Sequence, residues 1–174
     1  MTLNTSTFSL AGKKGLILGV ANESSIAWGC TQLMHQLGAE LVVSCLNDKA
    51  RRFVEPLTQP IGVELVTCNV EEEGELEAAV QHAIARMGQL DFVIHSIAWA
   101  PLADLHGNVI DSSSDGFSRA MAVSCHSFAR LAKLCAPHMP NGGSMLSMTY
   151  LGADEAVPHY GLMGPVKAAL ESLT

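Results

Sequence analysis

Charged residues are scarce in this 174-residue chain, since Asp, Glu, Lys and Arg make up only 16% of it, against about a quarter of an average soluble protein. Apolar residues make up 48%, which excludes intrinsic disorder and is typical of elements buried on more than one side. The net charge is −7 with only ten Lys and Arg, so we expect no nucleic-acid partner, because phosphate binding needs a basic face. The length predicts a single domain, residues 1–174.

The chain also lacks the patterns of a metal site, a disulfide framework or a serine hydrolase. Its five cysteines include no C-x-x-C, its seven histidines no H-x3-H, and no G-x-S-x-G occurs. We therefore expect no metal and a reducing compartment. Residues 1–14 lack the apolar core of a signal peptide, and the long uncharged stretch 134–153 is broken by prolines and glycines. These features predict a cytoplasmic protein without a membrane span.

What the sequence does contain is an alternation of short apolar runs with amphipathic stretches. The apolar runs predict strands at residues 15–20, 41–45, 63–68, 92–97 and 144–148. Helical patterns lie between them, at residues 25–37, 49–58, 72–87, 114–135 and from about 159 to the end. Such buried strands separated by helices predict an α/β fold, a Rossmann-like doubly wound parallel sheet that binds a dinucleotide.

The last helical pattern reaches Thr174 without a cap, a glycine or a proline. Helices ordinarily end with such a signal. We therefore expect a domain truncated in its last helix, either as a natural short form or because part of a longer protein is absent.

Ligands of such sheets bind beyond the carboxyl ends of the strands. The turn after the first strand is not G-x-G-x-x-G, but Gly19 allows close backbone approach and Ser25 can cap the next helix, whose free N–H groups would face a pyrophosphate. An ordinary capped turn explains the same residues. The other strand ends carry Leu46, Asn69, Val70, Ser96 and Ile97. Asn69 could accept from an adenine amino group and Ile97 could contact the ribose or nicotinamide, although each also fits a simple strand end.

The only two tyrosines, Tyr150 and Tyr160, both follow the fifth apolar run. Lys167 lies seven residues after Tyr160, which is two helical turns, so we expect both side chains on one helix face. An ammonium near a phenol lowers the phenol pKa and lets it donate to a developing oxyanion. By spacing alone, a surface tyrosine and a surface lysine are the simpler interpretation.

Three motifs taken together resemble bacterial enoyl-acyl-carrier-protein reductases, a divergent branch of the short-chain dehydrogenase/reductase superfamily. They are Gly19-x5-Ser25-Ile26-Ala27-x-Gly29, His95-Ser96-Ile97-Ala98-Trp99-Ala100-Pro101, and Tyr150-Leu151-Gly152-Ala153-x6-Tyr160-x6-Lys167-Ala168. The resemblance covers the whole chain in order. It implies that relatives continue past the last helix into a sixth strand, a substrate-covering loop and a seventh strand.

The resemblance also implies roles for individual positions. NADH would be contacted by Gly19, Ser25, Ile26, Leu46, Asn69, Val70, Ser96, Ile97 and Lys167. The acyl substrate would meet Ala100, Tyr150 and Tyr160, and the catalytic residues would be Tyr150, Tyr160 and Lys167. Leu46 and Asn69 stand where the family usually has glutamine and aspartate, so one polar contact to the adenosine is lost. Ala98 replaces a common glycine and narrows that part of the pocket.

The activity that the resemblance implies is reduction of trans-2-enoyl-acyl-carrier-protein thioesters by NADH, in a homotetramer. NADPH is less expected, because Arg51 and Arg52 lie inside the helix after the second strand. Ordinary superfamily members carry Tyr-x3-Lys, but Met163 stands four residues before Lys167, which disfavours a keto-group reductase. Such a reductase and a non-catalytic dinucleotide-binding fragment remain the alternatives.

Overall fold

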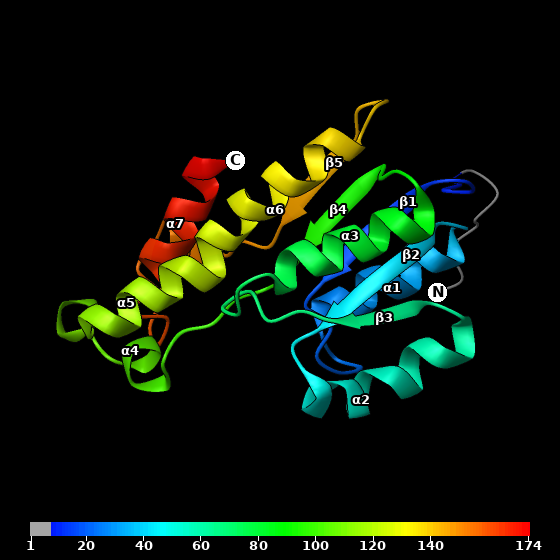
Figure 1. Ribbon diagram of the computed structural model, residues 1–174. Helices are drawn as coiled ribbons and strands as arrows, with labels where there is room; N and C mark the ends of the chain where they lie inside the picture. Colours follow the sequence, from blue (N-terminus) through cyan, green and yellow to red (C-terminus); the bar gives the residue numbers. More distant parts are fainter. Residues whose placement is uncertain (1–7) are drawn as a thin grey trace. The chain divides into compact units, whose positions relative to one another are not determined.

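The structure is a computed structural model that describes residues 8–174, and it confirms the Rossmann-like parallel sheet (Figure 1). The strands are β1 (Lys14–Leu18), β2 (Glu40–Cys45), β3 (Glu64–Thr67), β4 (Phe92–His95) and β5 (Ser144–Ser147). Their order in the sheet is β3-β2-β1-β4-β5. β1 pairs in parallel with β2 and β4, and β2 pairs in parallel with β3. All five predicted strands are present, with ends shifted by one or a few residues.

The helices are α1 (Ile26–Gln36), α2 (Asp48–Thr58), α3 (Glu75–Met87), α4 (Leu102–His106), α5 (Ser114–Met121), α6 (Ser127–Cys135) and α7 (Met163–Leu173). Short 3-10 turns cover Gln59–Ile61, Val109–Asp111, Ala136–His138 and Leu151–Ala153. A π-helical turn, Ala122–His126, separates α5 from α6. The long helix predicted over 114–135 is therefore confirmed in its extent, but it is not a regular α-helix throughout, and the short helix α4 was not predicted.

The described residues divide into two compact units. The first consists of the residues up to Ser96 together with 134–146, and it contains most of the sheet with α1, α2 and α3. The second consists of 97–133 and 147–174, and it contains α4, α5, the π turn and α7. The single domain expected from the chain length stays a prediction. Within residues 8–174 no helix is both long and apolar enough to cross a membrane.

The core of the first unit is built by the buried strands and the helices that connect them. After β3 the chain returns through α3 to β4, on the other side of β1. Because parallel crossovers are right-handed, this reversal places α1 and α3 on opposite faces of the sheet (Figure 1). The buried face of α3 consists of Leu76, Ala79, Val80, Ala83 and Met87, whereas Ile84 is only half-buried.

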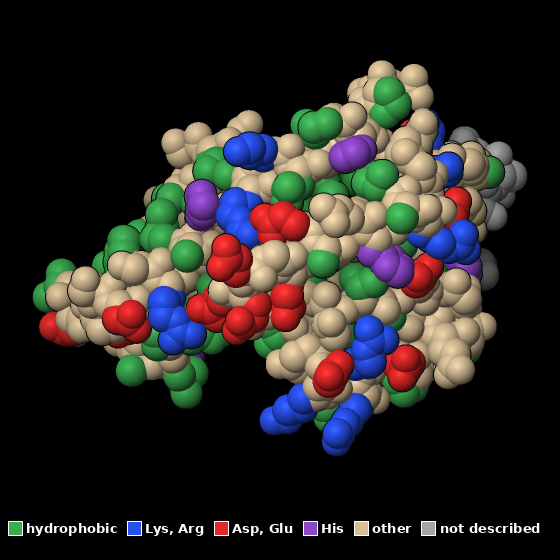
Figure 2. Space-filling view, in the orientation of Figure 1, with side chains coloured by type: hydrophobic (Ala, Val, Ile, Leu, Met, Phe, Trp, Pro, Cys, Tyr) green, Lys and Arg blue, Asp and Glu red, His purple; other side chains and the backbone are tan. Residues whose placement is uncertain are grey.

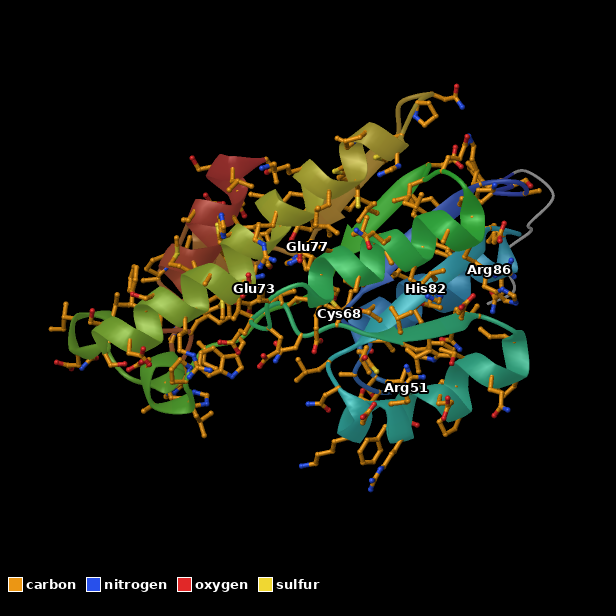
Figure 3. The ribbon with its side chains drawn as sticks, viewed as in Figure 1. Arg51, Cys68, Glu73, Glu77, His82 and Arg86 are labelled. Carbon is orange, nitrogen blue, oxygen red and sulfur yellow. The ribbon has the colours of Figure 1, made fainter. Side chains whose placement is uncertain are left out.

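The start of α3 is acidic and faces solvent, as its run of glutamates predicts. Figure 2 shows acidic side chains gathered over this part of the surface, and Figure 3 places Glu73 and Glu77 there. Negative charge at a helix N-terminus is favoured by the helix dipole. Further along the helix, His82 and Arg86 pair with Glu64, with Arg86 Nε 3.1 Å from Glu64 Oε2. Exposed ion pairs of this kind contribute little to stability.

We expect substitutions at two glycines of the first unit to change stability in opposite directions. A Cβ on Gly15 of β1 would lie 2.2 Å from the Phe92 ring of β4, so Gly15→Ala should lower the free energy of unfolding by about 1–3 kcal/mol through overpacking. Gly29 is exposed in α1 with no atom within 4 Å of an added Cβ, so Gly29→Ala should raise it by about 0.5–1 kcal/mol. Urea unfolding of both variants measures this, and equal effects would contradict the packing of β1 on β4.

Candidate active site

The first unit forms the expected turn between β1 and α1. Gly19 has φ 99°, a left-handed value that favours glycine, and its N–H points to Ser44 at the end of β2, 3.3 Å from the backbone oxygen. Ser25 is the N-cap of α1: its Oγ donates to Asn22 O at 2.7 Å and accepts from the N–H of Trp28 at 3.4 Å. Ile26 follows with 62% of its surface exposed. The predicted cap is confirmed, and the first N–H groups of an eleven-residue helix face outward beside a glycine.

The other residues of the first unit that were expected to contact NADH lie at the ends of β2, β3 and β4. Leu46 is 53% exposed directly after β2, Val70 is buried after β3, and Ser96 donates its N–H to Leu18 O at 3.0 Å. β4 itself ends at His95, so the predicted strand over 92–97 is too long.

Asn69 forms two hydrogen bonds with residues that follow it closely in the sequence. Its Oδ1 accepts from the N–H of Glu71 at 3.1 Å, and its own N–H donates to Glu75 Oε2 at 2.7 Å. This Asx turn uses one of the two lone pairs on the side-chain oxygen. The simpler interpretation of Asn69 as a turn residue therefore accounts for its geometry, and one lone pair remains for an adenine amino group.

In the second unit, Lys167 of α7 is buried with only 4% of its surface exposed. Its Nζ donates to the backbone oxygen of Met148, which directly follows β5, at 2.6 Å. Burial lowers the pKa of Lys167, and its interaction with the Cys125 thiol opposes that shift. The interpretation of Lys167 as a surface lysine is therefore wrong. An ammonium has three donors, so this buried group offers hydrogen bonds to a polar ligand beyond the one that Met148 accepts.

Tyr150 and Tyr160 form a pair whose ring centroids lie 4.8 Å apart at an angle of 56°. The ring of Tyr160 packs on Gly152, where an added Cβ would lie 2.3 Å from Tyr160 Cδ1. Tyr150 is 51% exposed, whereas Tyr160 is half-buried. The structure thus brings together the two tyrosines that the sequence singled out.

The prediction that Tyr160 and Lys167 share one helix face is wrong. α7 begins at Met163, after Tyr160, because His159 and Gly161 both have left-handed φ values of 62° and 25°. Tyr160 therefore lies in a tight turn. Two residues later, the N–H of Leu162 donates to Asp104 O in α4 at 3.1 Å. The turn, and not helical periodicity, places the phenol.

The expected lowering of the phenol pKa by Lys167 is also wrong. Burial raises the pKa of Tyr160, and the neighbouring Tyr150 raises it further. Tyr160 therefore keeps its proton through neutral pH and can act as a hydrogen-bond donor.

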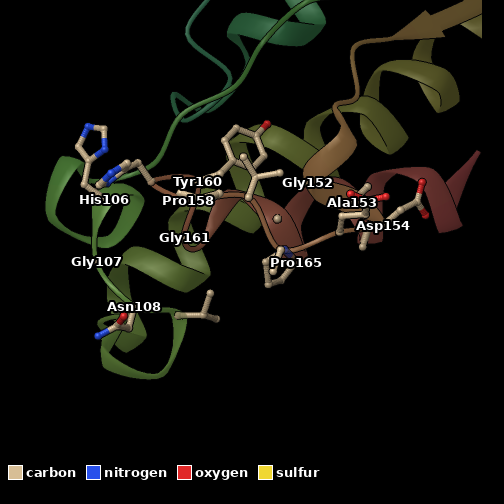
Figure 4. Close-up of a pocket in the computed structure, with 17 residues that line it drawn as sticks. His106, Gly107, Asn108, Gly152, Ala153, Asp154, Pro158, Tyr160, Gly161 and Pro165 are labelled. Atoms are coloured by element: carbon tan, nitrogen blue, oxygen red, sulfur yellow. The ribbon is translucent and has the colours of Figure 1, made fainter.

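A cavity of about 780 Å³ opens beside Tyr160 in the second unit (Figure 4). Gly152 and Pro158 line one part of it, and His106 and Asn108, at and after the end of α4, line another. The α4 side of the cavity was not predicted, although Pro101 before this helix and Gly107 after it are signals of a short helix. Among residues 8–174 no three His, Cys, Asp or Glu side chains are grouped as a metal ion would need.

The remaining expected residues, Ile97 and Ala100, are half-buried in the loop 97–101 between β4 and α4. Trp99, between them, exchanges hydrogen bonds with Ser124 of the π turn. The sequence analysis did not identify Ser124, because it predicted a regular helix there.

Comparisons with known proteins agree with these features. Residues 19–174 match the family model described as enoyl-(acyl carrier protein) reductase. The chain is 42% identical over 162 residues to enoyl-(acyl-carrier-protein) reductase (NADH) 2 of Rhizobium meliloti, with 92% of the chain and 60% of the relative covered. It is 42% identical over 166 residues to the NADH-dependent reductase FabI of Synechocystis, with 93% of the chain and 64% of the relative covered.

A solved structure is similar as well. The reductase from Anaplasma phagocytophilum, crystallised in complex with NAD, matches with a TM-score of 0.91 at 38% identity. That match covers 95% of this chain and 64% of the other. The chain thus spans less than two thirds of the length of these relatives.

The raised pKa of Tyr160 can be measured directly in a Tyr150→Phe variant, in which Tyr160 is the only tyrosine. Because burial is the larger cause of the shift, we expect this phenol to titrate above the ordinary value of about 10 even without Tyr150. Ultraviolet absorbance against pH gives the value. A phenol that ionises below the ordinary pKa would contradict the buried environment and restore the influence expected from Lys167.

Proposed function

Because this chain belongs to the enoyl-(acyl carrier protein) reductase family, we propose that it reduces trans-2-enoyl-acyl-carrier-protein thioesters to saturated acyl thioesters with NADH. One observation carries the proposal: a single compact unit holds the buried Lys167 ammonium at the end of β5 and the Tyr150–Tyr160 pair. Met163 stands four residues before Lys167, so the Tyr-x3-Lys pair of a keto-group reductase is absent. The two tyrosines therefore act on a different oxygen, that of the thioester.

The residues fit NADH in each unit separately. In the first unit, Gly19, Ser25 and Ile26 would hold the pyrophosphate, because the turn presents backbone N–H groups at the start of α1. Leu46, Asn69, Val70 and Ser96 lie at the ends of the neighbouring strands, where the adenosine would bind. In the second unit, the donors of Lys167 suit the two ribose hydroxyls of the nicotinamide half, and Ile97 offers an apolar contact. When bound, NADH supplies the hydride that adds to C3 of the enoyl group.

NADH fits better than NADPH, because the guanidinium of Arg51, on the helix after β2, already has partners within the chain. Arg51 donates to Leu65 O at 3.2 Å and pairs with Glu55 at 3.4 Å and Asp48 at 4.0 Å. Asp48 also opens α2, and its carboxylate repels a phosphate.

The tyrosines stabilise the charge that the reaction creates. As hydride reaches C3, negative charge develops on the thioester oxygen, and a proton at C2 then completes the saturated product. Tyr160 keeps its own proton because its pKa is raised, so it donates a hydrogen bond to that oxygen. Tyr150, tilted against it, shapes the acyl site together with Ala100 and supports the same oxygen. The buried charge of Lys167 adds positive potential.

The proposal includes the acyl carrier protein as the partner that delivers the substrate, and a cytoplasmic location.

The proposal also includes assembly of the chain into a homotetramer. Small residues between 122 and 132 are available for close subunit contact, because Ala122 is exposed and Ala129 and Ala132 are half-buried, whereas Ala120 is buried within its own chain. We expect light scattering to give the mass of four 18.4 kDa chains, and a clean monomer would contradict the assembly.

The assignment of Lys167 and Tyr160 is tested by separating binding from turnover. Lys167→Met removes a charged donor to two hydroxyls, so NADH binding should weaken by roughly 1.5–3 kcal/mol, or about 10- to 150-fold in the dissociation constant. Tyr160→Phe should leave NADH affinity nearly unchanged and lower turnover of an enoyl thioester. Fluorescence titration measures the NADH affinity of each variant, and steady-state kinetics measures its turnover of the enoyl thioester.

Lys133→Met is the matched control, because Lys133 is exposed on α6 and its loss should leave both quantities unchanged. NADH binding by Lys167→Met that equals the parent's would show that α7 does not contribute to the cofactor site. A parent chain that binds NADH but reduces no enoyl thioester would be a dinucleotide-binding module.

A further inference from the structure

The backbone N–H and the backbone oxygen of Trp99 both form hydrogen bonds with one side chain, that of Ser124. Its N–H donates to Ser124 Oγ at 2.8 Å, and the Ser124 hydroxyl donates back to Trp99 O at 3.0 Å. Ser124 is completely buried. A buried hydroxyl that satisfies a backbone donor and a backbone acceptor of the same residue fixes that residue in position and orientation.

The π turn explains why Ser124 can reach the loop. Residues Val123, Ser124 and Cys125 are consecutive and all buried. An α-helix advances by about 100° per residue and presents such a run less well to one neighbour, whereas the wider π turn directs all three inward. Single π turns inside helices recur at functional sites. Cys125 of this turn interacts electrostatically with Lys167, so the same turn adjoins both the loop and the lysine.

Arg119 of α5 holds the side chain of the same residue. Its guanidinium carbon lies 4.4 Å from the centroid of the Trp99 ring. A planar guanidinium over an indole face is a favourable cation–π arrangement. Trp99 is therefore fixed through its backbone by Ser124 and through its ring by Arg119.

We propose that Ser124 and Arg119 are positioning residues, which clamp Trp99 and thereby hold the loop 97–101 in the shape that the acyl substrate needs. Trp99 is the central residue of this loop, next to Ala100 and two residues after Ile97, and Pro101 at its end caps α4. The inference rests on the proposed function, since it assigns the loop its role in that reaction. Neither residue touches a reacting atom.

Hydrogen exchange tests the backbone half of the clamp. In Ser124→Ala we expect exchange at the Trp99 amide to rise about tenfold or more, because its acceptor is gone. Ser127→Ala is the matched control: Ser127 is equally buried, and its hydroxyl donates to Val123 O at 2.6 Å within the helix. Unchanged exchange in Ser124→Ala, or the same rise in both variants, would overturn the proposal.

Fluorescence tests the contact between Arg119 and the ring of Trp99. In a Trp28→Phe background, Trp99 is the only tryptophan. Arg119→Gln should then shift the emission of Trp99 to the red as the ring loses its cover, while Arg130→Gln on α6 should not. Identical spectra for Arg119→Gln and its parent would overturn the assignment of Arg119. Peptide-level exchange over 97–101 in Arg119→Gln gives the same answer without the Trp28 substitution.

Kinetics with a crotonyl thioester separates positioning from general stability. A displaced loop should raise the KM for the thioester about tenfold in Ser124→Ala, with kcat and NADH affinity within about twofold of the parent. A loosened loop with an unchanged KM would overturn the positioning role. If the parent itself reduces no enoyl thioester, the proposed function fails, and exchange at Trp99 then decides the clamp alone.

Discussion

A buried ammonium is the constraint on which the second unit depends. Lys167 is charged at neutral pH only if polar groups replace the water that burial removes, and its desolvation lowers its pKa. The backbone oxygen of Met148 supplies one such group. The position of Met148 is set by β5, which it directly follows. The position of Lys167 is set by α7, which packs on the π turn and on the Leu151–Ala153 turn. The proposed function assigns the remaining donors of the ammonium to the ribose hydroxyls of NADH.

The tyrosines complete this unit through backbone geometry rather than through charge. The ring of Tyr160 lies against Gly152, where no larger residue fits without moving it. Left-handed backbone at His159 and Gly161 turns the chain sharply at Tyr160. Non-glycine residues in this conformation cost energy and persist where tertiary contacts impose them. Here the contact is the hydrogen bond from the Leu162 N–H to Asp104 O, which makes α4 a support for the turn that carries Tyr160.

Much of the architecture follows from local patterns. Apolar runs long enough for one strand, separated by helical periodicity, leave few topologies other than a parallel sheet with helices on both faces. The cap at Ser25 and the buried face of α3 were predictable for the same reason, since each depends on neighbouring residues in the sequence. Pairing of Tyr150 with Tyr160 followed from the family motif, and the structure brings the rings together.

Several features that the sequence did not predict depend on contacts between distant segments. The π turn at Ala122–His126 has no local sequence signal, and its Ser124 is explained only by Trp99, which is 25 residues away. The late start of α7 depends on α4, and the raised pKa of Tyr160 depends on burial rather than on spacing to Lys167. The local hydrogen bond that Asn69 Oδ1 accepts from the N–H of Glu71 agrees with the simpler interpretation of Asn69 as a strand-end residue.

Isotope transfer is the most direct test of the central claim that this chain reduces an enoyl thioester with NADH. The chain would be incubated with crotonyl thioester and NADH deuterated at the transferable position of the nicotinamide, and the product examined by mass spectrometry and NMR. The account predicts one deuterium at C3 of the saturated butyryl thioester. Deuterium retained entirely in the cofactor, or transferred only to a 3-keto thioester supplied in a parallel incubation, would contradict it.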